Sequence, residues 1–178
     1  MLTEQEINNV FSWLKDRNEW PNEMHEIENK INFIFGTLIK RFTNSTFFET
    51  FQSQDGTNSN FLEFICFPLG HDRYFGEAIM VRTSLCSSLA AYGQVYFDKT
   101  ADGLSYNSIT PEIVGIVKDP NLIDIETQVI KILTDSGFEL INKEFAERLL
   151  PAEIDESLKK EIFYEGNQYL HGIFQIIE

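Results

Sequence analysis

His71, Asp72 and Arg73 follow one another in the chain, and the next cysteine downstream is Cys86. A histidine beside an aspartate can act as a general base, and an arginine can hold an anion. Cys86 paired with His71 would in principle give a thiolate nucleophile. Adjacent side chains on a turn usually point in different directions, so a solvated turn and a small buried thiol are the competing interpretation. A small hydrolase or transferase with its site near these residues is our second functional hypothesis.

Metal and cofactor motifs are incomplete or absent. The run from Asp98 to Gly103 imitates the start of an EF-hand loop, but position twelve, where calcium needs a bidentate carboxylate, is Ile109. The histidines His25, His71 and His171 are too scattered to predict a zinc site. The main phosphate-binding and nucleophile signatures do not occur. We therefore expect no metal and no cofactor.

Carboxylates and aromatic rings alternate between Pro151 and Gly172. Carboxylates steer a cationic partner toward a surface, and rigid rings can anchor it there. The competing interpretation is that the rings belong to the core and the acids simply face water. As a patch, this segment is the predicted partner-binding site, with residues Glu153, Asp155, Glu156, Glu161, Tyr164 and Glu165.

The charge of the chain is strongly negative, with a formal net charge of −14. From Ala101 to the C-terminus, fifteen acidic side chains stand against six basic ones. Nucleic acids and anionic membranes repel such a chain, because binding them requires clustered Lys and Arg. A basic protein partner is favoured instead, although acidity also keeps many proteins soluble without any partner.

The elements that would position these residues begin with two helices. Thr3 and Glu6 form a capping box ahead of an apolar stripe, which predicts a helix over about 3–17. A second stripe from Met24 to Leu38 predicts a helix ending near Arg41. Strands are predicted over 46–52, 61–67, 74–83 and 91–98. Their short connections favour antiparallel pairing.

After a loop over 98–111, the second half of the chain is predicted to be mainly helical. A helix is expected over about 121–136 with Gly137 as its stop signal, followed by an extended piece at 138–141 and a helical turn at 143–150. The tail after 170 fits a helix or a strand. Helices before and after a run of strands indicate an α+β fold, with an antiparallel sheet of about four strands in a single domain over 1–178.

Two cysteines without C-x-x-C spacing, Cys66 and Cys86, predict buried free thiols in a reducing compartment. The N-terminus lacks the basic and apolar stretches of a secretion signal, and no apolar run reaches membrane-spanning length. We therefore expect a soluble cytoplasmic protein.

The leading functional hypothesis is a non-enzymatic binding protein. The chain resembles bacterial immunity proteins in type, since these are often small, acidic, single-domain proteins without catalytic motifs. Such a protein would cover the cationic site of a basic toxin domain, as a monomer or weak homodimer that binds neither nucleic acid nor membrane. A third hypothesis is a structural adaptor subunit of a larger assembly.

Overall fold

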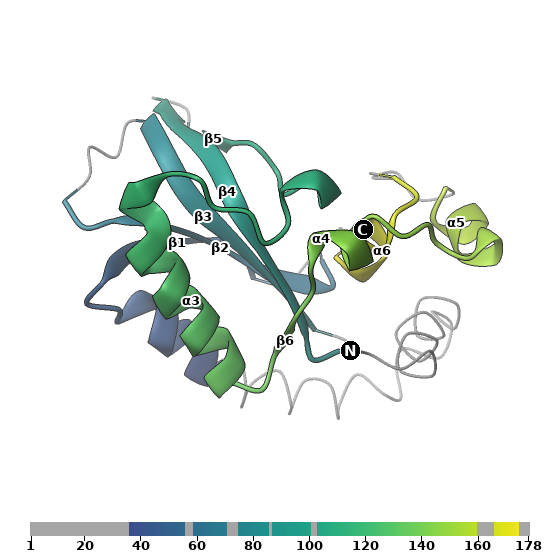
Figure 1. Cartoon of the computed structure of the whole chain (residues 1–178), viewed down its shortest axis with the longest axis horizontal. Coiled ribbons are helices and arrows are strands. Elements are labelled where there is room, and N and C mark those ends of the chain that lie inside the picture. The colour runs from purple at the N-terminus through teal and green to yellow at the C-terminus, as the bar shows by residue number, and fades with distance from the viewer. Residues whose placement is uncertain are drawn as a thin grey trace.

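The computed structural model describes residues 36–55, 59–70, 75–85, 87–100, 103–159 and 166–174 (Figure 1). Residues 36–43 are helical. The strands are β1 (Phe48–Asp55), β2 (Phe61–Pro68), β3 (Phe75–Ser84), β4 (Leu89–Thr100), β5 (Gly103–Tyr106) and β6 (Glu139–Leu140). The helices are α3 (Ile123–Asp135), α4 (Lys143–Ala146), α5 (Ala152–Leu158) and α6 (Tyr169–Ile173), with 3-10 turns η2 (Pro111–Ile113) and η3 (Pro120–Leu122).

The six strands found in the described ranges belong to one sheet. Five of them form an antiparallel meander in the order β1-β2-β3-β4-β5, because short turns pair each strand with the next one in the chain. β6 instead pairs in parallel with the start of β4, where Glu139 lies opposite Leu89. The register of β1 breaks between Gln52 and Gln54, which marks a bulge.

Both faces of the sheet are covered. Every residue of β2 from Phe61 to Phe67 is buried, as expected for a strand between two layers. On one face, here called the α3 face, helix 36–43 and α3 lie side by side (Figure 1), and Phe42 stacks on Phe64 with ring centroids 4.6 Å apart. The opposite face, here called the C-terminal face, packs against α4, α5, α6 and the segment around η2.

Helix α3 follows from its apolar spacing. Ile125, Val129 and Leu133 recur at helical intervals and are buried against the sheet. The polar side of α3 is also bonded to the sheet, because the Tyr92 hydroxyl donates to Glu126 Oε1 at 3.0 Å. Burial, then this hydrogen bond and the negative charge of Glu126, raise the pKa of Tyr92 to about 12. The predicted stop is confirmed, since Gly137 has a φ of 85°, which glycine adopts without steric cost.

The outer edge of β4 is covered by a succession of segments. β6 pairs with its first residues and β5 with its last. Between them, the Gly115 N–H donates to the Tyr92 carbonyl at 2.8 Å, and the Gln94 N–H donates to the Ile116 carbonyl at 3.1 Å. Gly93 lies under this segment, and a Cβ there would stand 2.8 Å from the Ile113 carbonyl oxygen. Glycine at this position therefore permits the close approach.

The predicted α+β class is confirmed, but the sheet is larger than expected. In the described residues it has six strands rather than about four, and the parallel pairing of β6 makes it mixed rather than purely antiparallel. β5 lies in the 98–111 segment predicted as a loop and is only four residues long, and β6 has two. Strands this short depend on pairing with β4 and leave little periodic pattern of their own.

The helices agree with expectation in part. The helix predicted over 121–136 corresponds to η3 and α3, the turn after 143 to α4, and the ambiguous tail is helical through Ile173. The helix predicted over 3–17, and the part of the second helix before residue 36, lie outside the described residues. In the stretches that the structure does describe, no helix is both long and apolar enough to cross a membrane.

Candidate functional site

Three of the predicted partner-binding residues lie on α5, which Figure 1 places at the opposite end of the molecule from β1. Ile154 and Leu158 are buried in the core on the C-terminal face and anchor this short helix. Glu153 and Glu156 are consequently exposed, and Asp155 is half-buried. The helix, which the sequence did not predict, thus presents carboxylates to solvent.

Lys159 neutralises part of this acidic helix. Its ammonium lies 2.8 Å from Asp155 Oδ2 and 3.1 Å from Glu156 Oε1. The hydrogen bonds with Asp155 and then Glu156 raise the pKa of Lys159 above its ordinary value. Asp155 and Glu156 therefore already contact a cation that directly follows the helix, which makes α5 a weaker site for a cationic partner than its sequence indicated.

Several predicted residues lie outside the part of the chain that the structure describes. They are Glu161, Tyr164 and Glu165 of the acidic segment, and His71, Asp72 and Cys86 of the alternative catalytic site. Their roles stay predictions. Tyr169, an aromatic residue of the same acidic segment, is half-buried and packs edge-to-face on Phe145 at 5.2 Å. This ring therefore packs at least in part within the protein.

Cys66 has the properties of a structural thiol. It is a free, buried cysteine on β2, and its Sγ lies 4.0 Å from the Thr50 hydroxyl. Burial raises the pKa of the thiol well above its ordinary value, and the Thr50 contact lowers it only in part. The prediction of a buried free thiol is confirmed for Cys66, and such a thiol is a poor nucleophile. Among the residues described, no group of three His, Cys, Asp or Glu side chains could hold a metal.

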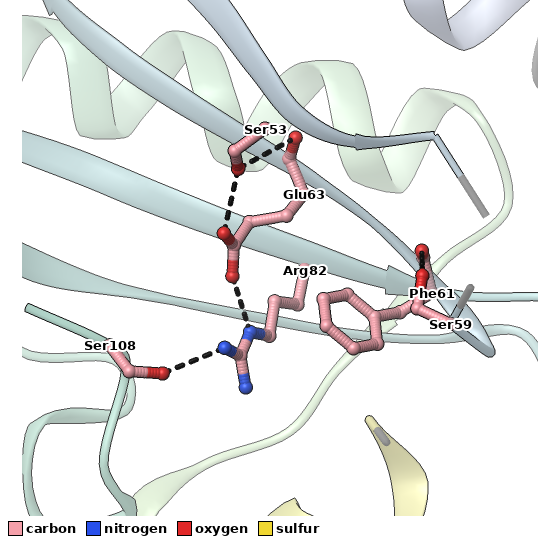
Figure 2. Close-up of polar contacts among 6 residues, drawn as sticks. All are labelled: Ser53, Ser59, Phe61, Glu63, Arg82 and Ser108. Atoms are coloured by element: carbon pink, nitrogen blue, oxygen red, sulfur yellow. Dashed lines mark hydrogen bonds and ion pairs between the residues drawn. The ribbon is translucent and has the colours of Figure 1, made fainter. Parts of the chain in front are cut away.

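A buried ion pair on the C-terminal face is a polar feature that the sequence did not predict (Figure 2). Glu63 on β2 and Arg82 on β3 lie opposite each other in the ladder and are only 2% and 4% exposed. Arg82 Nε donates to Glu63 Oε2 at 2.6 Å, and its Nη2 donates to Ser108 Oγ at 2.7 Å. The guanidinium also lies over the Phe61 ring, 4.7 Å from its centroid.

The network around this pair extends to the edge of the sheet. The Ser53 hydroxyl, at the bulge of β1, donates to Glu63 Oε1 at 2.7 Å. Burial raises the pKa of Tyr106 on β5, a hydrogen bond with Ser53 lowers it, and the Glu63 carboxylate raises it again. The network therefore links four strands, β1, β2, β3 and β5, and the segment after β5. Because its charged groups are buried and bound to each other, its role is to hold these elements in place.

An acidic surface with an exposed ring lies on the α3 face, at the end of the sheet where β3 begins. Tyr96 on β4 is 44% exposed and pairs across the ladder with Glu77 on β3. Asp98 is also exposed, and alternation along β4 puts it on the same face as Tyr96. Together with Asp119, these residues are called the Tyr96 surface.

Gln94 holds the parts of the Tyr96 surface together. Its Nε2 donates to Glu77 Oε2 at 3.0 Å, and its Oε1 accepts from the backbone N–H groups of Lys118 and Asp119 at 2.6 and 2.9 Å. Asp119 in turn caps η3 by accepting from the Asn121 N–H at 2.9 Å. Within the described part of the chain, no lysine or arginine forms an ion pair with Glu77, Asp98 or Asp119.

Sequence reasoning missed this surface because its residues come from three separate segments. Their only local signal is the alternation of Gln94, Tyr96 and Asp98 along a strand whose other side is apolar. No protein family, no curated protein and no solved structure matches the chain. The surfaces of the protein are therefore what indicates its function.

Proposed function

We propose that the chain is a non-enzymatic binding protein for a basic partner, acting as an inhibitor of the immunity type that covers the cationic site of a toxin domain. The observation that carries this proposal is the Tyr96 surface, where an exposed ring pairs across the ladder with Glu77, shares a face of β4 with Asp98 and is joined to the Asp119 segment through Gln94. It supplies the combination of charge and aromatic anchor that the sequence predicted for the 151–172 segment.

The chemistry of this surface suits lysine and arginine side chains. The face of a tyrosine ring attracts a cation by about 0.5–1 kcal/mol at exposed sites. Neighbouring carboxylates add charge-assisted hydrogen bonds and steer the partner during approach. Tyr96 and Glu77 stand on paired strands, and Gln94 fixes Asp119 through its backbone. Little ordering is needed on binding, which favours affinity.

The α5 helix keeps a smaller part in the proposal. Glu153 and Glu156 extend the negative field at the other end of the molecule, but Asp155 and Glu156 already contact Lys159. We assign α5 a contribution to long-range attraction rather than direct contact. Reversal of charge at Glu153 should slow association slightly and leave the dissociation rate unchanged.

The test is affinity capture from native lysate with immobilised full-length protein, at low and at high salt, followed by mass spectrometry. Wild type should retain a basic protein at low salt and release it at high salt, because screening weakens charge attraction. The E77K/D98K variant should lose this protein. The matched control E112K/E144K makes the same change of charge at two exposed acids elsewhere and should retain it.

Association rates of the captured protein then separate contact from general charge. E77K/D98K should slow association about tenfold or more, and the control variant by a few-fold at most. Stoichiometric addition of wild type should also inhibit the activity of the captured protein. Equal effects of the two variants, or failure of wild type to capture any basic protein, would sink the proposal.

A further inference from the structure

The two edges of the sheet differ in whether other segments of the described chain cover them. The outer edge of β4 is covered in turn by β6, by residues 113–116 and by β5. β1 forms the other edge, and no strand in the described ranges pairs with its outer side. In an antiparallel pair, alternate residues direct their N–H and C=O groups away from the neighbouring strand. These outward groups of β1 are the ones that an added strand would bond.

Exposed apolar side chains gather at this edge. Phe47, which directly precedes β1, is 56% exposed, and Phe51 within β1 is 43% exposed. Leu69 is 55% exposed and follows Pro68, which pairs with Phe48 at the same end of the ladder. Clustered exposed hydrophobic side chains, unlike single ones, mark interaction sites.

A carboxylate lies among these apolar side chains. Glu49 stands on the same face of β1 as Phe51, since strand residues alternate, and its Oε1 accepts from the Gly70 N–H at 3.3 Å. The chain as a whole carries a net charge of −14. A complementary strand would alternate apolar residues with a lysine or arginine opposite Glu49, since opposite charges across strands attract.

The bulge sets the length of a docked strand. After Gln52 the register of β1 breaks, and the Ser53 hydroxyl turns inward to the buried Glu63 (Figure 2). Arg82 holds that carboxylate in place. The regular part of β1 therefore covers 48–52, which spans about 17 Å at about 3.4 Å per residue.

We propose that the β1 edge, defined by Phe47, Glu49, Phe51 and Leu69, docks an extended basic and apolar segment of another protein by strand addition. Backbone hydrogen bonds would supply affinity, and the side chains on alternate positions would supply specificity. The inference rests on the proposed function, because it names the kind of segment through which a basic partner is held.

A second copy of this chain is a poorer occupant of the edge. Pairing of two β1 strands would join two chains that each carry −14, so their fields repel. The bulge between Gln52 and Gln54 would also interrupt the ladder on both sides. Self-association through β1 therefore counts against the proposal.

The test uses the full chain and a short fluorescein-labelled peptide that alternates valine and lysine. Fluorescence anisotropy compares wild type, F47S/F51S and the control I123S/L149S, which removes side chains that are 44% and 67% exposed elsewhere. F47S/F51S should weaken binding about tenfold or more, equivalent to about 1.4 kcal/mol, and the control should change it by less than about twofold. Circular dichroism and melting temperatures establish that both variants are folded.

Backbone pairing is tested with the same peptide methylated at every amide, which can donate no backbone hydrogen bond from either edge and should not bind. Equal binding of the methylated peptide, no binding by wild type, or dimerisation that F47S/F51S abolishes would overturn the inference. If a captured basic protein is lost with E77K/D98K but retained with F47S/F51S, the proposed function stands and the edge site fails. If wild type binds the peptide but captures no basic protein, the edge site stands and the proposed function fails.

Discussion

Removing one member of the Glu63–Arg82 pair leaves the other charge buried without its main partner. The pair is 2–4% exposed, so solvent cannot compensate the remaining group. We predict that Arg82→Met lowers the free energy of unfolding by about 3–5 kcal/mol. This is a large fraction of the about 5–15 kcal/mol that stabilises a typical domain. Urea denaturation followed by circular dichroism measures the loss.

The double variant E63L/R82M provides the control, because it removes both charges and restores apolar packing. It should be clearly more stable than R82M alone. The prediction would be wrong if R82M lost less than about 1 kcal/mol of unfolding free energy. It would also be wrong if the loss in the double variant equalled the sum of the losses in the single variants, because the two charges would then not depend on each other. Glu63 is also the acceptor for Ser53, so R82M should not by itself release the bulge.

At the scale of the elements, the segment over β4 depends on Gly93. A Cβ at this position would meet the Ile113 carbonyl oxygen at 2.8 Å, and that oxygen belongs to the backbone, which cannot rotate away. Gly93→Ala should therefore destabilise the protein by about 1–3 kcal/mol and weaken the bond from Gly115 to Tyr92. Amide hydrogen exchange at Gly115 should speed up more than exchange within α3.

Gly36→Ala is the matched control for this substitution. Nothing lies within 4 Å of its added Cβ, and residue 36 is helical, where alanine is favoured over glycine by about 1 kcal/mol. G36A should be neutral or slightly stabilising. Equal destabilisation by both changes would mean that lost glycine flexibility, rather than the contact with Ile113, is responsible.

The elements also show what local sequence can and cannot predict. α3 and β2 were predictable, because Ile125, Val129 and Leu133 repeat at helical spacing and Phe61 to Phe67 reads as a buried strand. β5 was not predictable, because it exists through pairing with β4. β6 lies within the extended piece predicted at 138–141, but its parallel pairing with β4 was not predicted. The Tyr96 surface could not be predicted either, since β3, β4 and the turn before α3 come together only in the folded chain. The acids of α5 could be identified in the sequence, but their contacts with Lys159 depend on side-chain geometry and could not.

At the scale of the whole molecule, the net charge of −14 should limit stability as well as direct binding. Like charges repel in the compact state, and the Debye length falls from about 30 Å at 0.01 M salt to about 8 Å at 0.15 M. The described ion pairs on the surface, such as Lys131–Asp135 at 3.7 Å, are exposed and contribute little that salt could remove. Screening should therefore remove more repulsion than attraction.

We accordingly predict that the melting temperature rises when salt increases from about 0.01 to about 0.15 M at pH 7. A gain of about 1 kcal/mol would correspond to about 2–4 °C for a chain of this size. Calorimetry in sodium chloride and in potassium chloride should give the same rise, because screening does not depend on which of these cations is present. E77K/D98K, with a net charge of −10, should show a smaller rise. A melting temperature that falls with salt would mean that attractive pairs outweigh the repulsion, and the negative field would then be largely balanced within the fold rather than available to a basic partner.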